Sequence, residues 1–373
     1  MKILEAFGEQ IGSGGEEMFV LSVLRYADLK DAQVDCLTVF DCISPVFREE
    51  VEKRGGNVYA LNIVHRWNYF NNYMYRPVKD FLKSRHYDLI HIHSSSIGAL
   101  AAISAAAKRS GIPFVIAHSH STGKDNSWKH KVFQRLGALS MRLHVNRFCA
   151  CSMAAAEWKF GPGIAKRAKI IKNGILVDKF RFDPGRRKEY RQKLNIPDNA
   201  FVVGNVGRFS QEKNHPKLIE AFEAVAARRP DAWLLLVGDG RDMDAIKTMV
   251  KEKRLENRVI FTGSVPNVQD YLQAMDVFVF PSLFEGFGIA AIEAITAGLA
   301  VVASDRVPRD INVENRAVFL SLDAPADTWA QAIERFSTET RKDYSAIVRA
   351  AGYDIHSMAD DTAGMYFSAV HNR

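Results

Sequence analysis

Two glutamates, Glu285 and Glu293, flank a glycine turn in the second half of the chain. The apolar run 276–280 before this turn predicts a buried strand, and the Ala/Ile-rich run after Gly288 predicts a helix. A strand followed by a turn and a helix directs the first N–H groups of the helix at the carboxyl edge of a sheet, where phosphate groups bind. Carboxylates do not bind phosphate, but they accept hydrogen bonds from hydroxyl groups. The stretch therefore predicts a ligand with phosphates in its middle and hydroxyl-rich rings on both sides, such as a nucleotide-diphosphate sugar.

Each glutamate also has a simpler interpretation, because Glu285 would suit the helix dipole and Glu293 would be an ordinary solvated helix residue. The surrounding pattern favours ligand binding. Glu-x7-Glu across a strand-to-helix turn, with Pro-Ser before it and Glu-Ala after it, resembles the signature of the retaining glycosyltransferases of family 4, in particular bacterial exopolysaccharide and capsular enzymes. The resemblance implies the GT-B fold, an α/β architecture of two Rossmann-like parallel-sheet domains with the active site in the interdomain cleft.

Two cations stand near the start of the second half, where the predicted strand 201–208 meets its loop. They are Arg208 and Lys213. A diphosphate needs positive charge at such a place, and a guanidinium fork with an ammonium group supplies it. Both residues would otherwise be surface charges. The resemblance implies that they stabilise the leaving diphosphate, and that Glu285 holds hydroxyls of the sugar and Glu293 those of the ribose.

The same resemblance assigns roles to residues in both halves of the chain. The catalytic set is His118, Arg208, Lys213 and Glu285, and the donor-binding set is Gly14, Gly15, Gly207, Gly263, Phe287, Gly288, Ile289 and Glu293. The glycine loop at 12–15 lacks the Gly-x-Gly-x-x-Gly spacing of a dinucleotide site. No Asp-x-Asp motif is placed to carry a metal to the diphosphate. We therefore expect no metal and no cofactor, only a nucleotide-sugar co-substrate with UDP as the expected nucleotide.

Two histidine pairs accompany predicted strands of the first half. His118 and His120 follow the predicted strand 114–117, and His91 and His93 occupy the same kind of position one unit earlier. Two such pairs are compatible with a metal, but the sequence supplies no carboxylate at metal-ligand spacing. We expect hydrogen bonding to a substrate, which the resemblance assigns to His118 beside the donor sugar, and structural roles for the other three histidines.

Strands and helices alternate along the whole chain. The predicted strands are 2–7, 34–40, 57–61, 89–92, 114–117 and 147–151 in the first half, and 201–208, 233–240, 258–263, 276–280 and 300–303 in the second. This alternation gives parallel sheets covered on both faces. Asn173-Gly174 is first of all a turn, and in the resembling family such a run begins the interdomain linker. We therefore expect an acceptor-side domain at 1–182 with a C-terminal crossover helix at about 357–373, and a donor-binding domain at 183–356.

Net charge is unevenly distributed along the chain. Residues 1–185 hold 26 Lys/Arg and 17 Asp/Glu, a net of +9, and residues 186–373 hold 24 and 26, a net of −2, which together give +7. The first half is thus expected to meet something anionic, such as a membrane surface, a lipid pyrophosphate or nucleic acid. No pattern of a nucleic-acid-binding module supports the last of these partners.

Two segments carry signals for a membrane partner. Residues 66–76 interleave aromatic residues with arginines, and residues 128–143 keep apolar residues at helical spacing. The second segment also holds Lys129, Lys131, Arg135 and Arg142. A basic amphipathic helix with a tryptophan at one end is typical of an interfacial membrane element. An ordinary helix with a solvated basic face is the alternative.

Composition favours a soluble globular protein, because apolar residues make up 47% of the chain and charged residues 25%. No apolar run reaches the roughly 18 residues of a membrane span, and the acidic residue Glu5 interrupts any signal-peptide pattern. The four cysteines have neither disulfide density nor zinc spacing and are interpreted as reduced thiols. We expect a cytoplasmic protein, peripheral on the cytoplasmic face of the inner membrane.

The resemblance to family 4 implies a retaining hexosyltransferase that moves a sugar from a nucleotide-diphosphate sugar to the hydroxyl of a glycan or lipid-linked acceptor in exopolysaccharide or capsule synthesis. Other functions remain open. A nucleotide-sugar 2-epimerase would share the fold and the donor but would need no acceptor. A dinucleotide-dependent oxidoreductase is less compatible, because Gly-x-Gly-x-x-Gly follows no predicted strand. Binding of a nucleotide sugar without turnover would use the same residues.

Overall fold

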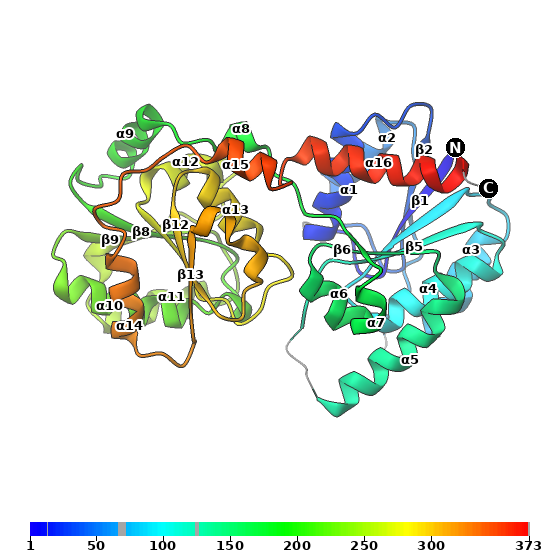
Figure 1. Cartoon of the computed structure of the whole chain (residues 1–373), viewed down its shortest axis with the longest axis horizontal. Helices are drawn as coiled ribbons and strands as arrows, with labels where there is room; N and C mark the ends of the chain where they lie inside the picture. The colour runs from blue at the N-terminus through cyan, green and yellow to red at the C-terminus, as the bar shows by residue number, and fades with distance from the viewer. Residues whose placement is uncertain (13, 66–71, 124–126, 372–373) are drawn as a thin grey trace. The chain divides into compact units, whose positions relative to one another are not determined.

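In a computed structural model, which describes residues 1–12, 14–65, 72–123 and 127–371, the chain forms two compact units (Figure 1). The first unit comprises residues 1–174 and 355–373, and the second comprises residues 175–354. The sequence placed the division a few residues later, at 182/183. The short helix α8 (Val177–Phe180) belongs to the second unit because it packs against α13 (Ile289–Thr296) and α15 (Ser345–Ala350).

The first unit is built on a parallel sheet with the strand order β3-β2-β1-β4-β5-β6-β7. The strands are β1 (Lys2–Phe7), β2 (Gln33–Thr38), β3 (Val58–Ala60), β4 (Leu89–His93), β5 (Phe114–Ser119), β6 (Arg147–Ala150) and β7 (Lys169–Ile170). Neighbouring strands run in register, with Glu5 opposite His91 and His93 opposite His118. The order reverses between β1 and β4, which is where open α/β sheets bind ligands at the carboxyl ends of their strands.

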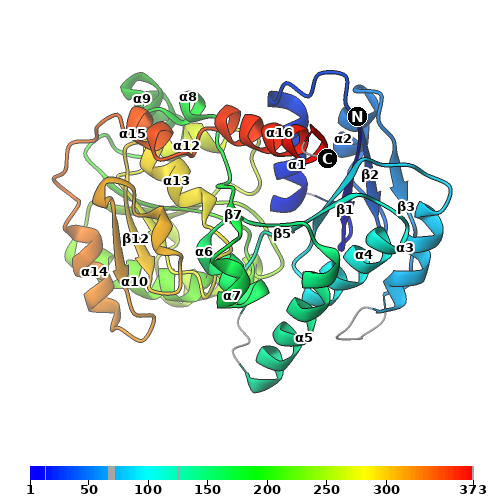
Figure 2. The same cartoon turned by 45° about the vertical axis from the view of Figure 1, so that its right-hand side comes forward.

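Helices cover both faces of this sheet (Figures 1 and 2). One face carries α1 (Gly15–Tyr26), α2 (Pro45–Glu52) and the C-terminal helix α16 (Ile355–His371), and the other carries α3 (Tyr75–Leu82), α4 (Ile97–Arg109), α5 (Trp128–His144), α6 (Met153–Phe160) and α7 (Pro162–Ala165). The helix α16 packs along α1, so the end of the chain completes the first unit.

The second unit repeats the design with the strand order β10-β9-β8-β11-β12-β13. Its strands are β8 (Phe201–Val206), β9 (Ala232–Val237), β10 (Val259–Phe261), β11 (Val277–Phe280), β12 (Ala300–Ser304) and β13 (Ala317–Leu320). One face carries α10 (His215–Arg228), α11 (Met243–Glu252) and α14 (Ala326–Glu334) (Figure 1). The other carries α8, α9 (Pro184–Lys193), α12 (Val268–Ala274), α13 and α15.

Both sheets bury their strands because helices cover each face, and this burial explains the continuous apolar runs that predicted them. In the second unit, Phe209, Phe222 and Trp329 are fully buried in one apolar cluster with the strand residues. The prediction of two Rossmann-like parallel-sheet domains is confirmed. The edge strand β13 was not predicted.

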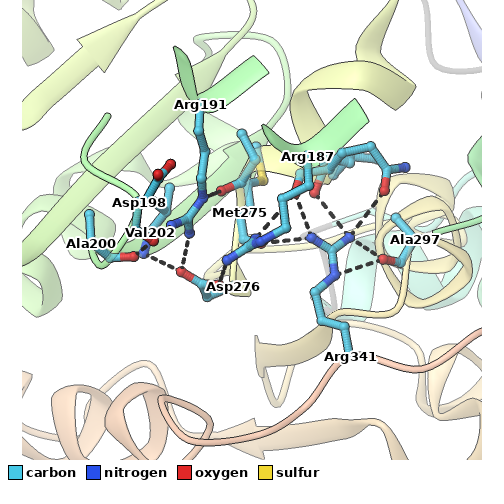
Figure 3. A network of polar contacts seen from close by, with 12 residues as sticks. Arg187, Arg191, Asp198, Ala200, Val202, Met275, Asp276, Ala297 and Arg341 are labelled. Atoms are coloured by element: carbon cyan, nitrogen blue, oxygen red, sulfur yellow. Dashed lines mark hydrogen bonds and ion pairs between the residues drawn. The ribbon is translucent and has the colours of Figure 1, made fainter. Parts of the chain in front are cut away.

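An arginine network fixes the start of β11, the strand that leads into the predicted phosphate-binding turn (Figure 3). Asp276 accepts hydrogen bonds from Arg187 at 2.6 Å, from Arg191 at 2.7 Å and from the backbone N–H of Val202 at 2.7 Å. On the other side, Arg341 donates to the carbonyl of Met275 at 2.9 Å. The network thus connects α9 and the segment before α15 to the neighbouring strands β8 and β11 and fixes how these strands pair.

No helix among the described residues is both long and apolar enough to cross a membrane. The aromatic and basic segment 66–76 lies partly outside the described residues, since only 72–76 are included.

Candidate active site

The turn between β11 and α13 is closed by Gly288, whose φ of 94° lies in the left-handed region that favours glycine. A Cβ at this position would also lie only 3.0 Å from the ring of Phe280. The helix α13 begins at Ile289, and no side chain caps its first turn. The helix thus presents uncapped N–H groups and its positive dipole end at the edge of the sheet, as an anion site requires.

The predicted catalytic residues Lys213 and Glu285 are in direct contact beside this turn. Lys213 Nζ donates to Glu285 Oε1 at 2.7 Å, and the Glu285 side chain is only 11% exposed. Lys213 also lies over the ring of Phe280. The carboxylate is largely shielded from water, and the ion pair holds the two side chains in place beside the turn.

Backbone and amide hydrogen bonds join the loops that carry these two residues. Asn214, in a left-handed conformation, donates its side-chain amide to the Pro281 carbonyl at 3.1 Å. The N–H of Leu283 donates to the Glu212 carbonyl at 2.8 Å. The loops after β8 and β11 therefore form one rigid edge, because the two strands are neighbours in the sheet.

The glycine turns after β8, β9 and β10 lie against one another. The N–H of Gly207 donates to Val237 O, and the N–H of Gly238 donates to Gly263 O, each at 3.0 Å. A Cβ at Gly238 would lie 2.0 Å from Gly207 O, so only glycine permits this approach. Arg208 is exposed on the same edge, and within the part of the chain that the structure describes its side chain has no hydrogen-bond or ion-pair partner.

Glu293 lies about one turn into α13 and is partly buried. Desolvation by burial raises its pKa to about 7, and Lys179 opposes the shift. The carboxyl group therefore titrates near neutral pH, and a ligand that donates hydrogen bonds to its charged form would lower that pKa. Phe287 is buried against the ring of Tyr353, so only its backbone is available to a ligand.

The remaining predicted residues, Gly14, Gly15 and His118, belong to the first unit. Gly14 is the N-cap of α1 and Gly15 its first residue. A Cβ at Gly14 would lie 2.6 Å from Glu17 Oε2, whereas nothing lies within 4 Å of a Cβ at Gly15. A side chain thus has no room at Gly14, whereas Gly15 at the start of the helix has open space around it.

The four histidines lie near the carboxyl ends of β4 and β5, where the sequence placed them, but they belong to the buried interior of the unit. His118 is inside β5, which runs on to Ser119, and His91 and His93 are inside β4. All three are fully buried, and His120 is 9% exposed. Phe19 of α1 covers them, with its ring centroid 4.9 Å from that of His118 and 5.2 Å from that of His120.

Glu5 and Tyr366 connect these histidines into two branches of hydrogen bonds. Tyr366 Oη donates to Glu5 Oε1 at 2.7 Å and contacts His91 Nδ1 at 2.6 Å, and His91 Nε2 contacts His118 Nδ1 at 3.1 Å. In the second branch His93 Nε2 contacts Glu5 Oε2 at 2.7 Å, and His93 Nδ1 contacts His120 Nε2 at 2.8 Å. The sequence had offered no carboxylate beside the histidines, and the fold supplies one from β1.

The branches end in two buried nitrogens without a hydrogen-bond partner among the described residues, His118 Nε2 and His120 Nδ1. Neutral imidazole has one donor and one acceptor nitrogen, so the direction of each hydrogen bond fixes the next. With Glu5 ionised, both terminal nitrogens are acceptors. Burial raises the pKa of Glu5 to about 8, so its carboxyl group is mostly protonated at neutral pH and can donate a hydrogen bond. This donation reverses the direction of the hydrogen bonds along one branch, and the terminal nitrogen of that branch becomes a donor. Contact between His118 and a donor sugar stays a prediction, and it requires Phe19 to move.

Two family models match consecutive parts of the chain. The model of glycosyltransferase family 4 matches residues 13–179, and that of the group 1 glycosyl transferases matches residues 186–352. Together they cover both units and define a glycosyltransferase of the GT-B type. The chain belongs to glycosyltransferase family 4.

Individual relatives agree with this assignment. The chain is 27% identical to EpsF of Bacillus subtilis (strain 168), which carries the name of a glycosyltransferase, over 96% of both chains. It is also 27% identical, over 78% of both, to an Escherichia coli UDP-Gal:α-D-GlcNAc-diphosphoundecaprenol α-1,3-galactosyltransferase. The solved structure of Anabaena HepE in complex with UDP shares the fold, with a TM-score of 0.75 and 22% identity over 99% of this chain and all of that one.

We predict that the first unit loses stability as the pH falls from about 6.5 to 4.5. Burial lowers the pKa of all four clustered histidines, that of His93 to about 3. Below about pH 6.5 these histidines bind protons in the unfolded chain but not in the folded chain. The free energy of unfolding therefore decreases by up to about 1.4 kcal/mol per histidine and pH unit. Glu5 acts in the opposite sense, since its raised pKa favours the folded state at low pH.

Hydrogen exchange of the β4 and β5 amides at several pH values measures this loss. The variant His118→Gln should show a shallower pH slope, whereas His371→Gln, an exposed control, should keep the slope of the parent chain. Equal slopes in the parent and in His118→Gln would contradict the buried neutral state of the cluster.

Proposed function

We propose that this glycosyltransferase transfers a hexose from a UDP-sugar to an acceptor hydroxyl with retention of configuration. The observation that supports this most is the ion pair of Lys213 and Glu285 beside the uncapped start of α13. It places a cation for phosphate and a carboxylate for hydroxyl groups side by side, and a sugar diphosphate has both groups at one end. The structural neighbour HepE was solved with UDP bound, which supports the choice of nucleotide.

Catalysis on this proposal is chiefly electrostatic. Negative charge grows on the diphosphate as the bond to the sugar breaks, and Lys213, Arg208 and the α13 N–H groups stabilise it. Preorganised donors of this kind contribute about 3 kcal/mol each. Glu285 holds sugar hydroxyls and Glu293 the ribose hydroxyls. We assign no covalent carboxylate, although many retaining glycosidases use one, and we expect no metal because the chain itself supplies the positive charge.

The proposed acceptor is a lipid-linked glycan in exopolysaccharide or capsule synthesis. The Escherichia coli relative is named for a sugar attached to diphosphoundecaprenol, and EpsF is a relative along nearly the whole chain. An acceptor of this kind is anchored in a membrane, so the enzyme must work at its surface. The first unit, with its net positive charge, would approach the anionic face.

The surface of α5 supports membrane docking. Ala138 and Met141 are buried, but other apolar side chains of the helix are not packed against the protein, since Trp128 is 72% exposed, Leu139 60% and Leu143 73%. The four basic residues of the helix, Lys129, Lys131, Arg135 and Arg142, are also exposed and have no ion-pair partner in the described chain. A helix with only a solvated basic face would not expose these apolar residues. Exposed apolar residues flanked by cations instead suit an anionic lipid interface.

We expect turnover with a lipid-linked acceptor to decide the reaction class. The protein should release UDP from one member of a panel of UDP-sugars, faster when a diphosphate-linked glycolipid is present. Lys213→Ala should lower kcat by about a hundredfold, and more than it raises KM, because Lys213 meets more negative charge in the transition state.

Lys213→Arg keeps the charge and should retain part of the activity, and Lys251→Ala is the matched surface control. Release of an epimerised sugar without any acceptor would instead assign a 2-epimerase. Near-native kcat in Lys213→Ala would place the diphosphate elsewhere.

A second prediction concerns proton release on nucleotide binding. Ribose hydroxyls that donate to Glu293 favour its charged form and lower its pKa from about 7. UDP affinity should therefore rise as the pH increases to about 7, by up to about tenfold per pH unit below that value, and level off above it. Calorimetry in buffers of different ionisation enthalpy measures the released proton.

Glu293→Gln isolates the contribution of this carboxyl group, because the phosphates of UDP titrate in the same way in both proteins. The variant should bind UDP more weakly and lose the additional pH dependence. Unchanged affinity and proton release in a folded Glu293→Gln would contradict the assigned ribose contact.

Membrane docking predicts sedimentation with anionic vesicles but not with neutral ones, and less at high salt. Replacing the four basic residues of α5 by Gln should abolish most of the binding. Each cation near an anionic surface contributes about 1 kcal/mol.

A control removes the same charge from the opposite face of the first unit by replacing Lys30, Arg48, Lys53 and Arg54 with Gln. This control should sediment like the parent chain. Equal losses in both variants would show that net charge, and not the α5 surface, attracts the protein.

A further inference from the structure

Three buried histidines of the first unit bring their ring nitrogens close together. One ring nitrogen from each of His91, His93 and His118 lies within 4.8 Å of the other two. His91 Nε2 and His118 Nδ1 are 3.1 Å apart. Two nitrogens bound tetrahedrally to one zinc ion are separated by about 3.3 Å. Small side-chain movements would therefore bring all three nitrogens to distances at which they can share a metal ion.

Neighbouring strands hold these rings on one face of the first sheet. Side chains alternate along a strand, so His91 and His93 of β4 point to the same side. In the register of the sheet, His93 lies opposite His118 of β5, and Glu5 of β1 lies opposite His91. The backbone of three hydrogen-bonded strands thus preorganises the cluster, since each of the three rings is part of a strand.

Glu5 and Tyr366 contact the far side of two of these rings. His93 Nε2 contacts Glu5 Oε2 at 2.7 Å, and His91 Nδ1 contacts Tyr366 Oη at 2.6 Å. Tyr366 in turn donates to Glu5 Oε1 at 2.7 Å. When Glu5 is ionised, both rings carry their proton on the nitrogen that faces this pair. His91 Nε2 and His93 Nδ1 then keep free lone pairs, as metal ligands need, and a carboxylate behind a ligating histidine is its usual second partner.

Buried carboxylates offset the charge that a divalent ion would bring. A dication in the interior is costly unless negative charge lies nearby. Glu5 is buried beside the rings, and a dication favours its ionised form. Glu17, also buried, favours positive charge at His93. Lys159 opposes positive charge, but it acts on His120, outside the group of three histidines. Two carboxylates are thus available to balance the two charges of the ion.

We propose that His91, His93 and His118 bind a zinc ion that stabilises the first unit. Imidazole nitrogens suit Zn²⁺, whereas Mg²⁺ and Ca²⁺ prefer oxygen ligands. His120 Nε2, 2.8 Å from His93 Nδ1, is the candidate for the fourth ligand. The sequence offered no carboxylate at metal-ligand spacing, but the fold places Glu5 behind the ligands, where it orients them without binding the ion.

The ion stabilises the fold and has no part in the proposed reaction. It would link β4 and β5 directly, and β1 through Glu5. Phe19 of α1 covers the rings, so the ion is taken up as the first unit folds. The inference does not rest on the proposed function, and its failure would leave the transferase standing.

Refolding with Zn²⁺ or with a chelator tests the proposal. The denatured parent chain is refolded in each condition and passed through gel filtration, and bound zinc is measured by mass spectrometry. We expect about one Zn²⁺ per chain after refolding with zinc, and a Tm above that of the chelator-treated protein. Glu5→Gln should weaken zinc binding about 10- to 100-fold in chelator competition, because it removes the partner that orients the ligands.

Ligand variants and a spectroscopic probe complete the test. His93→Gln and His118→Gln should lose the bound zinc, whereas His215→Gln, a buried control in the second unit, should keep it. Co²⁺ in the parent chain should show the intense visible absorption of tetrahedral coordination, which needs no variant to fold. A folded parent chain that retains no zinc, or a weak octahedral Co²⁺ spectrum, would overturn the site. Equal zinc retention in the parent and in folded His93→Gln and His118→Gln would overturn it as well.

Discussion

The donor side of this enzyme depends on the ion pair between Lys213 and Glu285. The pair joins two loops that are far apart in sequence and holds a cation and a carboxylate beside the uncapped N-terminus of α13. Either residue alone would be a poorly solvated charge. Together they are neutral, and in the proposed function they receive a phosphate and the hydroxyl groups of a sugar diphosphate. The site is thus preorganised, and little reorganisation is needed as charge develops.

The sheets impose this arrangement. Parallel strands bring their following loops to one edge, so β8 and β11 place Lys213 and Glu285 together without any local sequence signal. The arginine network around Asp276 fixes the register of these two strands. In the first unit the same geometry brings the histidines near the carboxyl ends of β4 and β5 together in a closed, uncharged cluster beneath α1.

Much of this architecture could be predicted from the sequence, because apolar runs indicate the buried strands and glycines indicate the turns that follow them. The edge strand β13 was not predicted. The predicted strand before His118 ended at Ala117, whereas β5 runs on to Ser119, and Glu5 and Tyr366 supply hydrogen bonds to His91 and His93 of the same cluster. Glu5 and Tyr366 carried no motif, and only the tertiary fold reveals their partners.

A crystal structure of the protein with UDP bound would test the proposed donor site most directly. We expect the diphosphate at the N-terminus of α13 within hydrogen-bond distance of Lys213 and Arg208, with the ribose hydroxyls on Glu293 and the base near Gly263. A nucleotide bound elsewhere on the second unit, or a diphosphate that contacts neither Lys213 nor the start of α13, would contradict this assignment.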